Sequence, residues 1–429
     1  MGATIIWRME SLGPNHVVIV GQGYVGLPVA MASVRAGYKV TGIDFDAEKV
    51  GFLAKGQSPV EDVSNGEIIS SLAQGLYHPT DDYSESLGFS VAVITVPTPL
   101  RKGAPDLSFI EAAASALSPW VAEGSTVILE STTYPGTTDE LLVPILEKGS
   151  GLVAGTDFFV GYSPERIDPG NSEWNLINTP KVVSGINSQS LEKVTSFYES
   201  LGIVTVPVSG TREAEMTKLL ENTFRHVNIA LVNELAMFSD QLGVDIWEAI
   251  DAASTKPFGF MKFTPGPGVG GHCLPIDPSY LAWAVKDKAE EDFKFVSLAN
   301  DVNESMPHFV VERACGILER SGTPVADASI LIIGLAYKPN TGDTRESPSV
   351  AVSQLLAARG ANLFAIDNHV PSHSWPGHIA RANDAEPGNF DLAILITNHS
   401  GGNHEWALSS SQTVLDTRNC LVGENVEPL

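Results

Sequence analysis

The chain has 429 residues, of which 43% are hydrophobic and 18% are charged. This composition excludes a disordered protein, and the length predicts two or three domains. Asp and Glu (51) outnumber Lys and Arg (26), so the formal net charge is -25, which disfavours binding to nucleic acid or to an anionic membrane surface.

The chain contains three cysteines, Cys273, Cys315 and Cys420. So few cysteines disfavour a disulfide framework and indicate a reducing compartment, so we expect a cytoplasmic protein. Residues 1–15 lack the pattern of a signal peptide, and we interpret them as an extension ahead of a start at Met9. No apolar run is long enough to cross a membrane.

The first predicted elements are a strand at residues 17–20, a glycine turn, a helix that ends at Gly37 and a strand at residues 40–43. The turn reads GQGYVG over residues 21–26, and Asp44 follows the second strand. Although a GxGxxG motif alone is weak evidence, a strand, helix, strand and acid at this spacing are typical of a dinucleotide-binding unit.

The rest of the chain divides into three regions. Strands at 91–96, 126–129 and 158–162 alternate with helices around 109–120 and 138–146, and 181–184 and 204–206 are predicted to close this doubly wound parallel sheet. A long helix over 213–242 precedes helices at 246–254, 281–286 and 296–302. After Pro307, helices at 309–319 and 349–358 accompany strands at 328–333, 363–366, 392–396 and 413–415.

These elements predict an α/β fold of two Rossmann-like doubly wound domains joined by a long central helix and a helical domain. We place the domains at residues 1–210, 211–306 and 307–429. The last of them resembles the first but lacks its glycine turn. Ligands of such folds bind in a crevice at the carboxyl ends of the strands.

A glycine-rich segment, GPGVGGHC over residues 266–273, presents a single cysteine. Glycines let the backbone bend sharply and approach a ligand. A thiolate attacks carbonyl carbons, so Cys273 is a candidate nucleophile, and Asp277 shares its face if a helical turn begins there. Burial as a small apolar side chain is the alternative interpretation, and we assign it to Cys315 and Cys420.

Lys218 and Asn222 are four residues apart on the long helix and therefore share a face, from which both could donate hydrogen bonds to an oxyanion. Polar loops follow three strands: ESTTYPGTT at 130–138, SPER at 163–166 with a possible general base, Glu165, and YKPNTGDTRESPS at 337–349. Each of these loops has a simple structural alternative, such as the N-cap of the next helix.

Taken together and in this order, the motifs GxGYVG, TVPTP, ESTTYPGTT, SPER, the Lys-Asn helix, GPGVGGHC and YKPNTGDTRESPS resemble the UDP-sugar 6-dehydrogenase family, also called nucleotide-sugar dehydrogenases. The resemblance covers residues 17–419. It implies oxidation of the C6 hydroxymethyl of a UDP-hexose to a carboxylate with two NAD, through a thiohemiacetal and a thioester on Cys273.

The resemblance also implies residue roles. Lys218 and Asn222 would stabilise oxyanions, Asp277 with Thr132 would hold a water molecule, and Glu165 would act in thioester hydrolysis. The residues expected to contact NAD are Gly21, Gly23, Tyr24, Val25, Gly26, Asp44, Thr98, Thr132 and Arg345. Those expected to contact the UDP-sugar are Glu165, Arg166, Lys218, Asn222, Lys256, Phe263, Gly266, Gly268, Gly270, Gly271, Tyr337, Lys338 and Arg418.

The segment TKPFGFM at 255–261 is similar to the UDP-N-acetylglucosamine branch of the family, so we expect that sugar, with UDP-glucose and UDP-N-acetylmannosamine as alternatives. Lys256 is a candidate to reach a neighbouring subunit's site. By the same resemblance, the long helix suits a homodimer or a higher homo-oligomer.

Other functions remain open at this point. A two-electron hydroxyacid dehydrogenase would share the architecture but would need no cysteine. A non-catalytic NAD sensor would keep the glycines and lose the nucleophile. A metal site at His272 and Cys273 would need further ligands, and we expect no metal.

Overall fold

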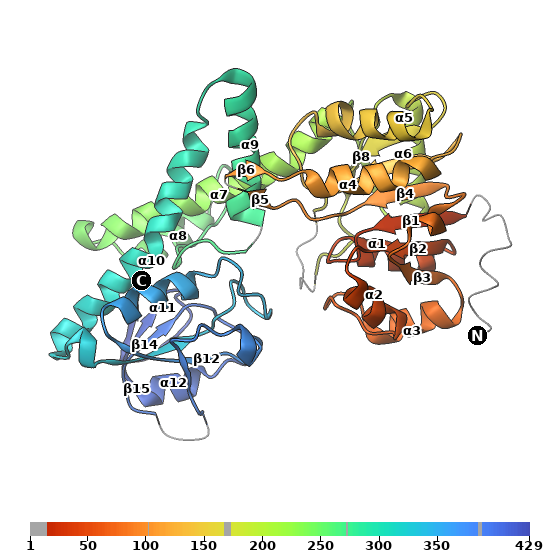
Figure 1. The fold of residues 1–429 in the computed structure, drawn as a ribbon. Helices are drawn as coiled ribbons and strands as arrows, with labels where there is room; N and C mark the ends of the chain where they lie inside the picture. Colours follow the sequence, from red (N-terminus) through yellow and green to blue (C-terminus); the bar gives the residue numbers. More distant parts are fainter. Residues whose placement is uncertain (1–14, 102, 167–172, 272, 385–387) are drawn as a thin grey trace. The chain divides into compact units, whose positions relative to one another are not determined.

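The computed structural model describes residues 15–101, 103–166, 173–271, 273–384 and 388–429, without the side chains of Asp240, Cys273 and Pro275. The chain forms two compact units, Met1–Glu221 and Asn222–Leu429, whose boundary falls within one long helix, α7 (Thr211–Leu242) (Figure 1). Each unit is described by itself. Met9 and His272 lie outside the described residues.

The first unit is built on a six-stranded sheet in which every neighbouring pair is parallel. The strand order is β3 (Tyr77–Thr80), β2 (Lys39–Ile43), β1 (His16–Val20), β4 (Val91–Ile94), β7 (Thr126–Leu129), β8 (Phe159–Tyr162). This order, 3-2-1-4-5-6 when the strands are counted in sequence, is that of dinucleotide-binding folds. It places the carboxyl ends of β1 and β4 side by side at the switch point.

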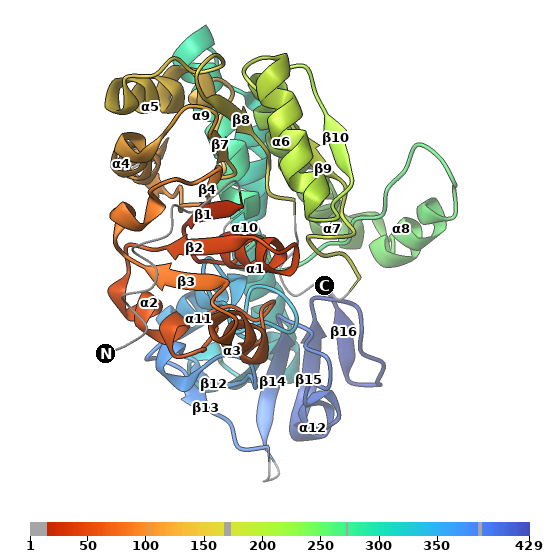
Figure 2. The same ribbon diagram turned by 90° about the vertical axis from the view of Figure 1, so that its right-hand side faces the viewer.

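Helices cover both faces of this sheet (Figures 1 and 2). One face carries α1 (Gly26–Arg35), α2 (Ala47–Ala54), α3 (Asn65–Ala73) and α6 (Ser188–Ser200), and the other carries α4 (Ser108–Leu117) and α5 (Val143–Ser150), which a π-helical turn, η3 (Thr138–Leu142), precedes. Two further pairs of short strands are β5 (Leu100–Arg101) with β6 (Ala104–Pro105), and β9 (Lys181–Val183) with β10 (Thr205–Pro207).

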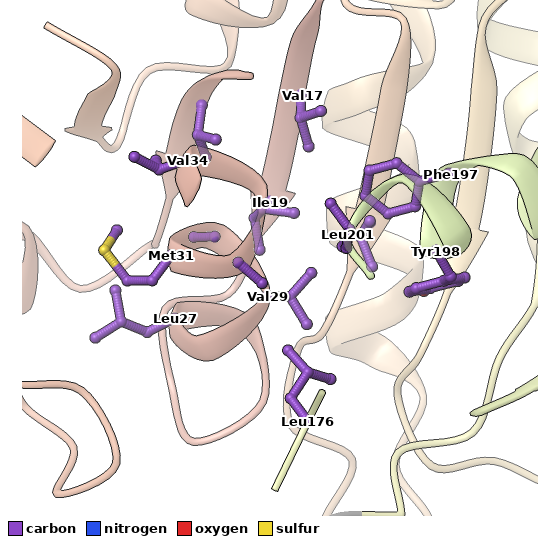
Figure 3. Close-up of a cluster of buried hydrophobic side chains, with 14 of the residues drawn as sticks. Val17, Ile19, Leu27, Val29, Met31, Val34, Leu176, Phe197, Tyr198 and Leu201 are labelled. Atoms are coloured by element: carbon purple, nitrogen blue, oxygen red, sulfur yellow. The ribbon is translucent and has the colours of Figure 1, made fainter. Parts of the chain in front are cut away.

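The core of the first unit explains why these residues form strands. Val17 and Ile19 of β1 point to the face covered by α1 and α6 (Figure 3), while Val18 and Val20 point to the opposite face. Because both faces are buried, β1 is an apolar run without alternation, as is typical of parallel sheets. Burial of a side chain such as Ile19 contributes about 1.5–3 kcal/mol.

The second unit repeats this plan after a helical segment. Its all-parallel sheet has the order β13 (Ala380–Arg381), β12 (Asn362–Ile366), β11 (Ser329–Ile333), β14 (Phe390–Leu395), β15 (Ser411–Asp416), β16 (Val426–Pro428). Helices α10 (Lys294–Ser321) and α11 (Pro348–Ala358) cover one face, and α12 (His404–Ser410) covers the other. The second part of α7, with α8 (Ile246–Ser254) and α9 (Cys273–Ala289), completes the unit.

The two six-stranded parallel sheets confirm the predicted fold class, but the expected elements differ from the structure at three places. The segments 181–184 and 204–206 do not extend the large sheet; they pair with each other as β9 and β10. The helix expected at 281–286 is only part of α9. The helices expected at 296–302 and 309–319 form one continuous α10 through Pro307, since the proline ring is buried in the core and its packing offsets the lost backbone hydrogen bond.

Within the described part of the chain, no helix combines the length and apolarity needed to cross a membrane.

Candidate functional site

The glycine turn between β1 and α1 has three glycines with three different surroundings. Gly21 has a φ of +98° and its backbone lies against Thr95, so that a Cβ would approach the Thr95 carbonyl oxygen to 2.7 Å. A Cβ on Gly26 would lie 1.9 Å from the Gly21 oxygen, whereas a Cβ on Gly23 would meet no heavy atom within 4 Å. Gly21 and Gly26 are therefore needed by the protein itself, while Gly23 leaves open the space in which such folds take a pyrophosphate.

The N-terminus of α1 also suits a dinucleotide. Its N-cap, Val25, makes no side-chain cap, so the first-turn N–H groups receive no hydrogen bond from a capping side chain. Such N–H groups bind phosphate, aided by the helix dipole. These features fit NAD, which Gly21, Gly23, Val25 and Gly26 would hold by its pyrophosphate. Tyr24, another expected NAD contact, is 41% exposed beside them.

Asp44 follows β2 at the same edge of the sheet and is buried. Its carboxylate accepts hydrogen bonds from the Gln22 backbone N–H at 2.8 Å and from Lys49 Nζ at 2.8 Å. The acid is thus fixed against the glycine turn, where it can accept from a ribose hydroxyl and repel a 2′-phosphate, as an NAD site requires.

The SPER loop, which follows β8, contacts the first turns of α7. Glu165 Oε2 lies 3.5 Å from Lys218 Nζ, and both side chains are nearly buried. Next to it, Arg166 forms an ion pair with Glu221 at 2.7 Å and donates to the Pro180 carbonyl. The structure therefore brings together Glu165 and Lys218, a carboxylate and an ammonium that the sequence places 53 residues apart.

Sequence reasoning missed a buried charged cluster behind this loop. Glu130, at the end of β7, accepts a hydrogen bond from Tyr198. It also forms an ion pair with Lys181, whose Nζ lies 3.2 Å from Glu130 Oε1. Lys181 Nζ also donates to the Pro164 carbonyl of the SPER loop at 3.4 Å. Burial and the neighbouring Glu130 carboxylate raise the pKa of Tyr198, which stays a neutral donor.

The second unit pairs two of the predicted catalytic residues. Asn222 Nδ2 donates to Asp277 Oδ2 at 2.6 Å, and both side chains are buried. Asp277 lies one turn into α9, a helix whose first residue is Cys273. The helical turn that would place Cys273 and Asp277 on one face is therefore present. The side chain of Cys273 and all of His272 lie outside the described residues.

The glycine segment before α9 is shaped by protein neighbours. A Cβ on Gly271 (φ +85°) would lie 2.5 Å from the Tyr337 ring, and one on Gly266 would lie 2.7 Å from Arg418 Nη1. The Gly266 N–H donates to Asn233 Oδ1 at 3.0 Å. At least two of the glycines, Gly266 and Gly271, thus let the segment pack against Arg418 and Tyr337, which brings together four of the predicted substrate contacts.

Arg418 follows β15 and is held by Asp416, which accepts its backbone N–H at 2.8 Å, and by the Ile396 carbonyl, which accepts from Nε at 2.7 Å. Desolvation lowers the pKa of Arg418 to about 10, so the guanidinium stays charged at neutral pH. A fixed cation with little water around it is suited to a phosphate group.

Left-handed backbone at non-glycine residues lies beside the other predicted basic contacts. Asn340 (φ +60°) is two residues from Lys338, Glu346 (φ +50°) follows Arg345, and Asn419 (φ +49°) follows Arg418. Arg345 itself forms a bidentate ion pair with Asp343. Such strained conformations persist where packing enforces them, and they concentrate at ligand-binding loops.

The remaining predicted residues are placed as follows. In the first unit, Thr98 and Thr132 are half-buried in the loops after β4 and β7. In the second unit, Phe263 packs edge-on against Phe224 at 5.8 Å between ring centroids, and Lys256 is exposed with its Nζ over the Phe258 ring. Gly268 and Gly270 lie in the glycine segment, and Lys338 Nζ is 5.8 Å from the Tyr337 ring centroid. Among described residues, no group of His, Cys, Asp and Glu could hold a metal ion.

Three family models match consecutive parts of the chain. They describe the UDP-glucose/GDP-mannose dehydrogenase family: its NAD-binding domain over residues 15–202, its central domain over 212–305 and its UDP-binding domain over 331–423.

Individual relatives are similar over most of the chain. The UDP-N-acetyl-D-mannosamine dehydrogenase of Pyrococcus horikoshii is 37% identical over 356 residues, which are 83% of this chain and 84% of the relative. The NDP-N-acetyl-D-galactosaminuronic acid dehydrogenase of Ralstonia nicotianae is 32% identical over 94% of this chain and 95% of its own. The solved structure of UDP-D-ManNAc dehydrogenase from P. horikoshii aligns with a TM-score of 0.86 at 32% identity, covering 96% and 98% of the two chains.

The names of these relatives do not support the expected UDP-N-acetylglucosamine branch: several similar enzymes are named for UDP-N-acetyl-D-mannosamine, and the Ralstonia relative is named for an NDP-N-acetyl-D-galactosaminuronic acid. The expectation rested on residues 255–261, all of which are exposed in the structure.

Proposed function

The chain belongs to the UDP-glucose/GDP-mannose dehydrogenase family and is an NAD-dependent nucleotide-sugar dehydrogenase, and on this premise we propose that it oxidises C6 of UDP-N-acetylmannosamine to the uronic acid. The observation that supports this sugar is the naming of relatives that cover more than four fifths of the chain. UDP-N-acetylglucosamine and UDP-glucose are the alternatives.

The reaction requires a covalent step. Oxidation of the alcohol removes a hydride and a proton and gives an aldehyde, which the thiolate of Cys273 attacks to form a thiohemiacetal after protonation of the oxyanion. A second loss of a hydride and a proton gives a thioester, and water releases the carboxylate and restores the thiol. NAD, when bound, accepts the hydride in each oxidation. The covalent bond keeps the half-oxidised sugar from leaving between the two steps.

The other residues act on charge and protons. Lys218 and Asn222 donate to the oxygen on which negative charge develops. Within the second unit, the Asn222–Asp277 hydrogen bond orients both the amide and the carboxylate, which lies one turn after Cys273 on α9 and acts on the hydrolytic water. Glu165, fixed by Lys218, assists thioester hydrolysis. Arg418 and Lys338 bind the diphosphate, and Arg166, Lys256, Phe263, Tyr337 and the glycine segment contact the remainder of the UDP-sugar.

The first test is a substrate screen. The purified protein is incubated with NAD and each UDP-hexose separately, and NADH absorbance is followed to completion. We expect the highest kcat/KM with UDP-N-acetylmannosamine and two NADH per acid formed. A preference for another UDP-hexose would refute the sugar, and one NADH per stable aldehyde would favour a hydroxyacid-dehydrogenase type of reaction.

A second test addresses the nucleophile. Cys273→Ser should abolish acid formation, while NAD binding, followed by fluorescence titration, stays within about twofold because the nucleotide turn is untouched. Full acid formation by this variant would exclude the covalent step.

We also propose that the protein is a homodimer or a higher homo-oligomer. The second part of α7 exposes a stripe of large apolar side chains, each 46–72% exposed: Leu231, Leu235, Phe238 and Leu242. Their spacing of three and four residues places them on one face of the helix, and the same stripe on a second copy would cover it. Leu235→Glu should reduce the mass measured by light scattering to that of the monomer, whereas the half-buried control Glu234→Gln should not.

A further inference from the structure

Glu215 on α7 is a buried acid that none of the roles above uses. Its side chain is 0% exposed. One carboxylate oxygen accepts the Gly136 N–H at 2.6 Å, and the other accepts the Thr138 N–H at 2.9 Å and the Thr138 hydroxyl at 2.7 Å. Burying a carboxylate costs free energy. The three hydrogen bonds to Glu215 oppose that cost.

The three donors belong to the loop that follows β7 and leads into η3. The loop is closed internally, since Thr137 donates to the Tyr134 carbonyl through its N–H at 3.2 Å and through its hydroxyl at 2.8 Å. The hydrogen bonds of Glu215 thus hold the backbone of a compact turn that begins at Tyr134, two residues after Thr132. Movement of the turn would therefore displace Thr132.

Glu215 also precedes Lys218 by three residues on α7, and both side chains are buried. Residues three apart on a helix are neighbours on its surface. The same helical segment thus binds the Thr132 loop through Glu215 and the SPER loop through Lys218, whose Nζ lies 3.5 Å from Glu165. All of these residues belong to the first unit.

We propose that Glu215 is a positioning residue, which fixes the loop carrying Thr132 to the turn of α7 carrying Lys218. The inference rests on the roles of Thr132 and Lys218 in the proposed function. It adds that their mutual placement depends on one buried carboxylate.

The ion pairs of Arg212, which also join α7 to η3, are too exposed to replace the hydrogen bonds of Glu215. Arg212 forms an ion pair with Glu140 at 2.7 Å and lies 3.6 Å from Asp139, but its side chain is 49% exposed. Exposed pairs contribute at most about 1 kcal/mol and are screened by salt. Without Glu215 we expect the loop to keep its internal fold but to shift relative to α7.

The test compares Glu215→Gln and Glu215→Asp with the control Glu213→Gln, an exposed acid two residues away on α7. Glutamine removes the charge and offers N–H where an acceptor is needed; aspartate keeps the charge and withdraws it by one methylene. Measured are kcat and KM with the UDP-hexose that the wild type oxidises best, the Kd of NAD, and the thermal midpoint.

We expect kcat to fall about 10- to 100-fold in both Glu215 variants, because displacement by an ångström has effects of this size. The Kd of NAD should stay within about twofold, and the control should behave as the wild type. Wild-type kcat in the folded variants would overturn the proposal, as would failure of both variants to fold, since Glu215 would then serve stability alone. If the wild type prefers a UDP-hexose other than the proposed one, the comparison of the variants still holds, because it is made with the sugar that the wild type oxidises best.

Discussion

Lys218 Nζ lies 3.5 Å from Glu165 Oε2, and the two side chains are only 7% and 12% exposed. With so little water around them, the two charges interact more strongly than a surface pair would. The ammonium that would stabilise an oxyanion and the carboxylate that would assist hydrolysis are therefore coupled before a substrate binds.

Replacing Lys218 with Met removes an oxyanion donor and leaves Glu165 without this cation. We expect kcat to fall about 100- to 1,000-fold, the usual effect of losing one such donor. In a double-mutant cycle with Glu165→Gln, the two effects should deviate from additivity by about 0.5–3 kcal/mol. Lys148→Met, an exposed lysine on α5, serves as the control and should leave kcat unchanged. Strict additivity would show that the pair is not coupled.

The glycine turn supports a prediction that separates stability from binding. In Gly26→Ala the new Cβ would lie 1.9 Å from the Gly21 oxygen, so the variant should lose about 3 kcal/mol or more of unfolding free energy. In Gly23→Ala the Cβ meets no protein atom within 4 Å, so stability should change by less than about 0.5 kcal/mol.

NAD affinity should nevertheless fall about tenfold in Gly23→Ala, because the Cβ enters the space in which the pyrophosphate is expected. Urea unfolding and NAD fluorescence titration check the two quantities on the same samples. Unchanged NAD binding in Gly23→Ala would place the pyrophosphate elsewhere.

Elements whose burial is visible in local sequence could be predicted. β1 and β7 are short apolar runs because both faces of the parallel sheet are covered, and α8 has a clear period and an Asp245 N-cap. β3 was missed, since its sequence, YHPT, contains a proline and polar residues that only an edge strand tolerates.

In the candidate site too, features that depend on nearby residues could be predicted, and features that depend on distant partners could not. The glycine turn, Asp44 and the helical spacing of Cys273 and Asp277 depend on neighbours in sequence and could be predicted. Glu130, Lys181 and Glu215 could not, because each is satisfied by partners far along the chain, such as Gly136 for Glu215. The available sign was a charged residue within an apolar segment, such as Lys181 ahead of two valines.

The pair of Lys181 and Glu130 leads to a stability prediction. Their side chains are 6% and 0% exposed, and Lys181→Met would leave the Glu130 carboxylate buried without its cation. Such a loss costs about 3–5 kcal/mol. Adding Glu130→Gln removes the stranded charge, so the double variant should recover most of the loss in urea unfolding. A double variant as unstable as Lys181→Met would argue that packing, and not charge, is responsible.

Glu215 makes stability depend on pH in a window that can be stated. Burial raises the pKa of Glu215 from 4.5 to about 7, against the opposing effect of its hydrogen bonds with Thr138 and Gly136. Between these two values the folded protein holds a proton that the unfolded chain has released. The contribution of this group to the unfolding free energy is therefore largest below pH 4.5, decreases as the pH rises towards 7, and is constant above that. The total decrease is about 1.4 kcal/mol per unit of difference between the two pKa values.

The measurement is the difference in unfolding free energy between the wild type and Glu215→Gln from pH 4 to pH 8. Asp139 and Arg212, whose charges interact with that of Glu215, are present in both proteins, so their titration largely cancels in the difference. We expect the wild type to lose about 3 kcal/mol relative to the variant between pH 4.5 and 7, and nothing further above pH 7. A difference that does not change with pH would mean that Glu215 has the same pKa in the folded and the unfolded chain, and that its three hydrogen bonds compensate its burial in full.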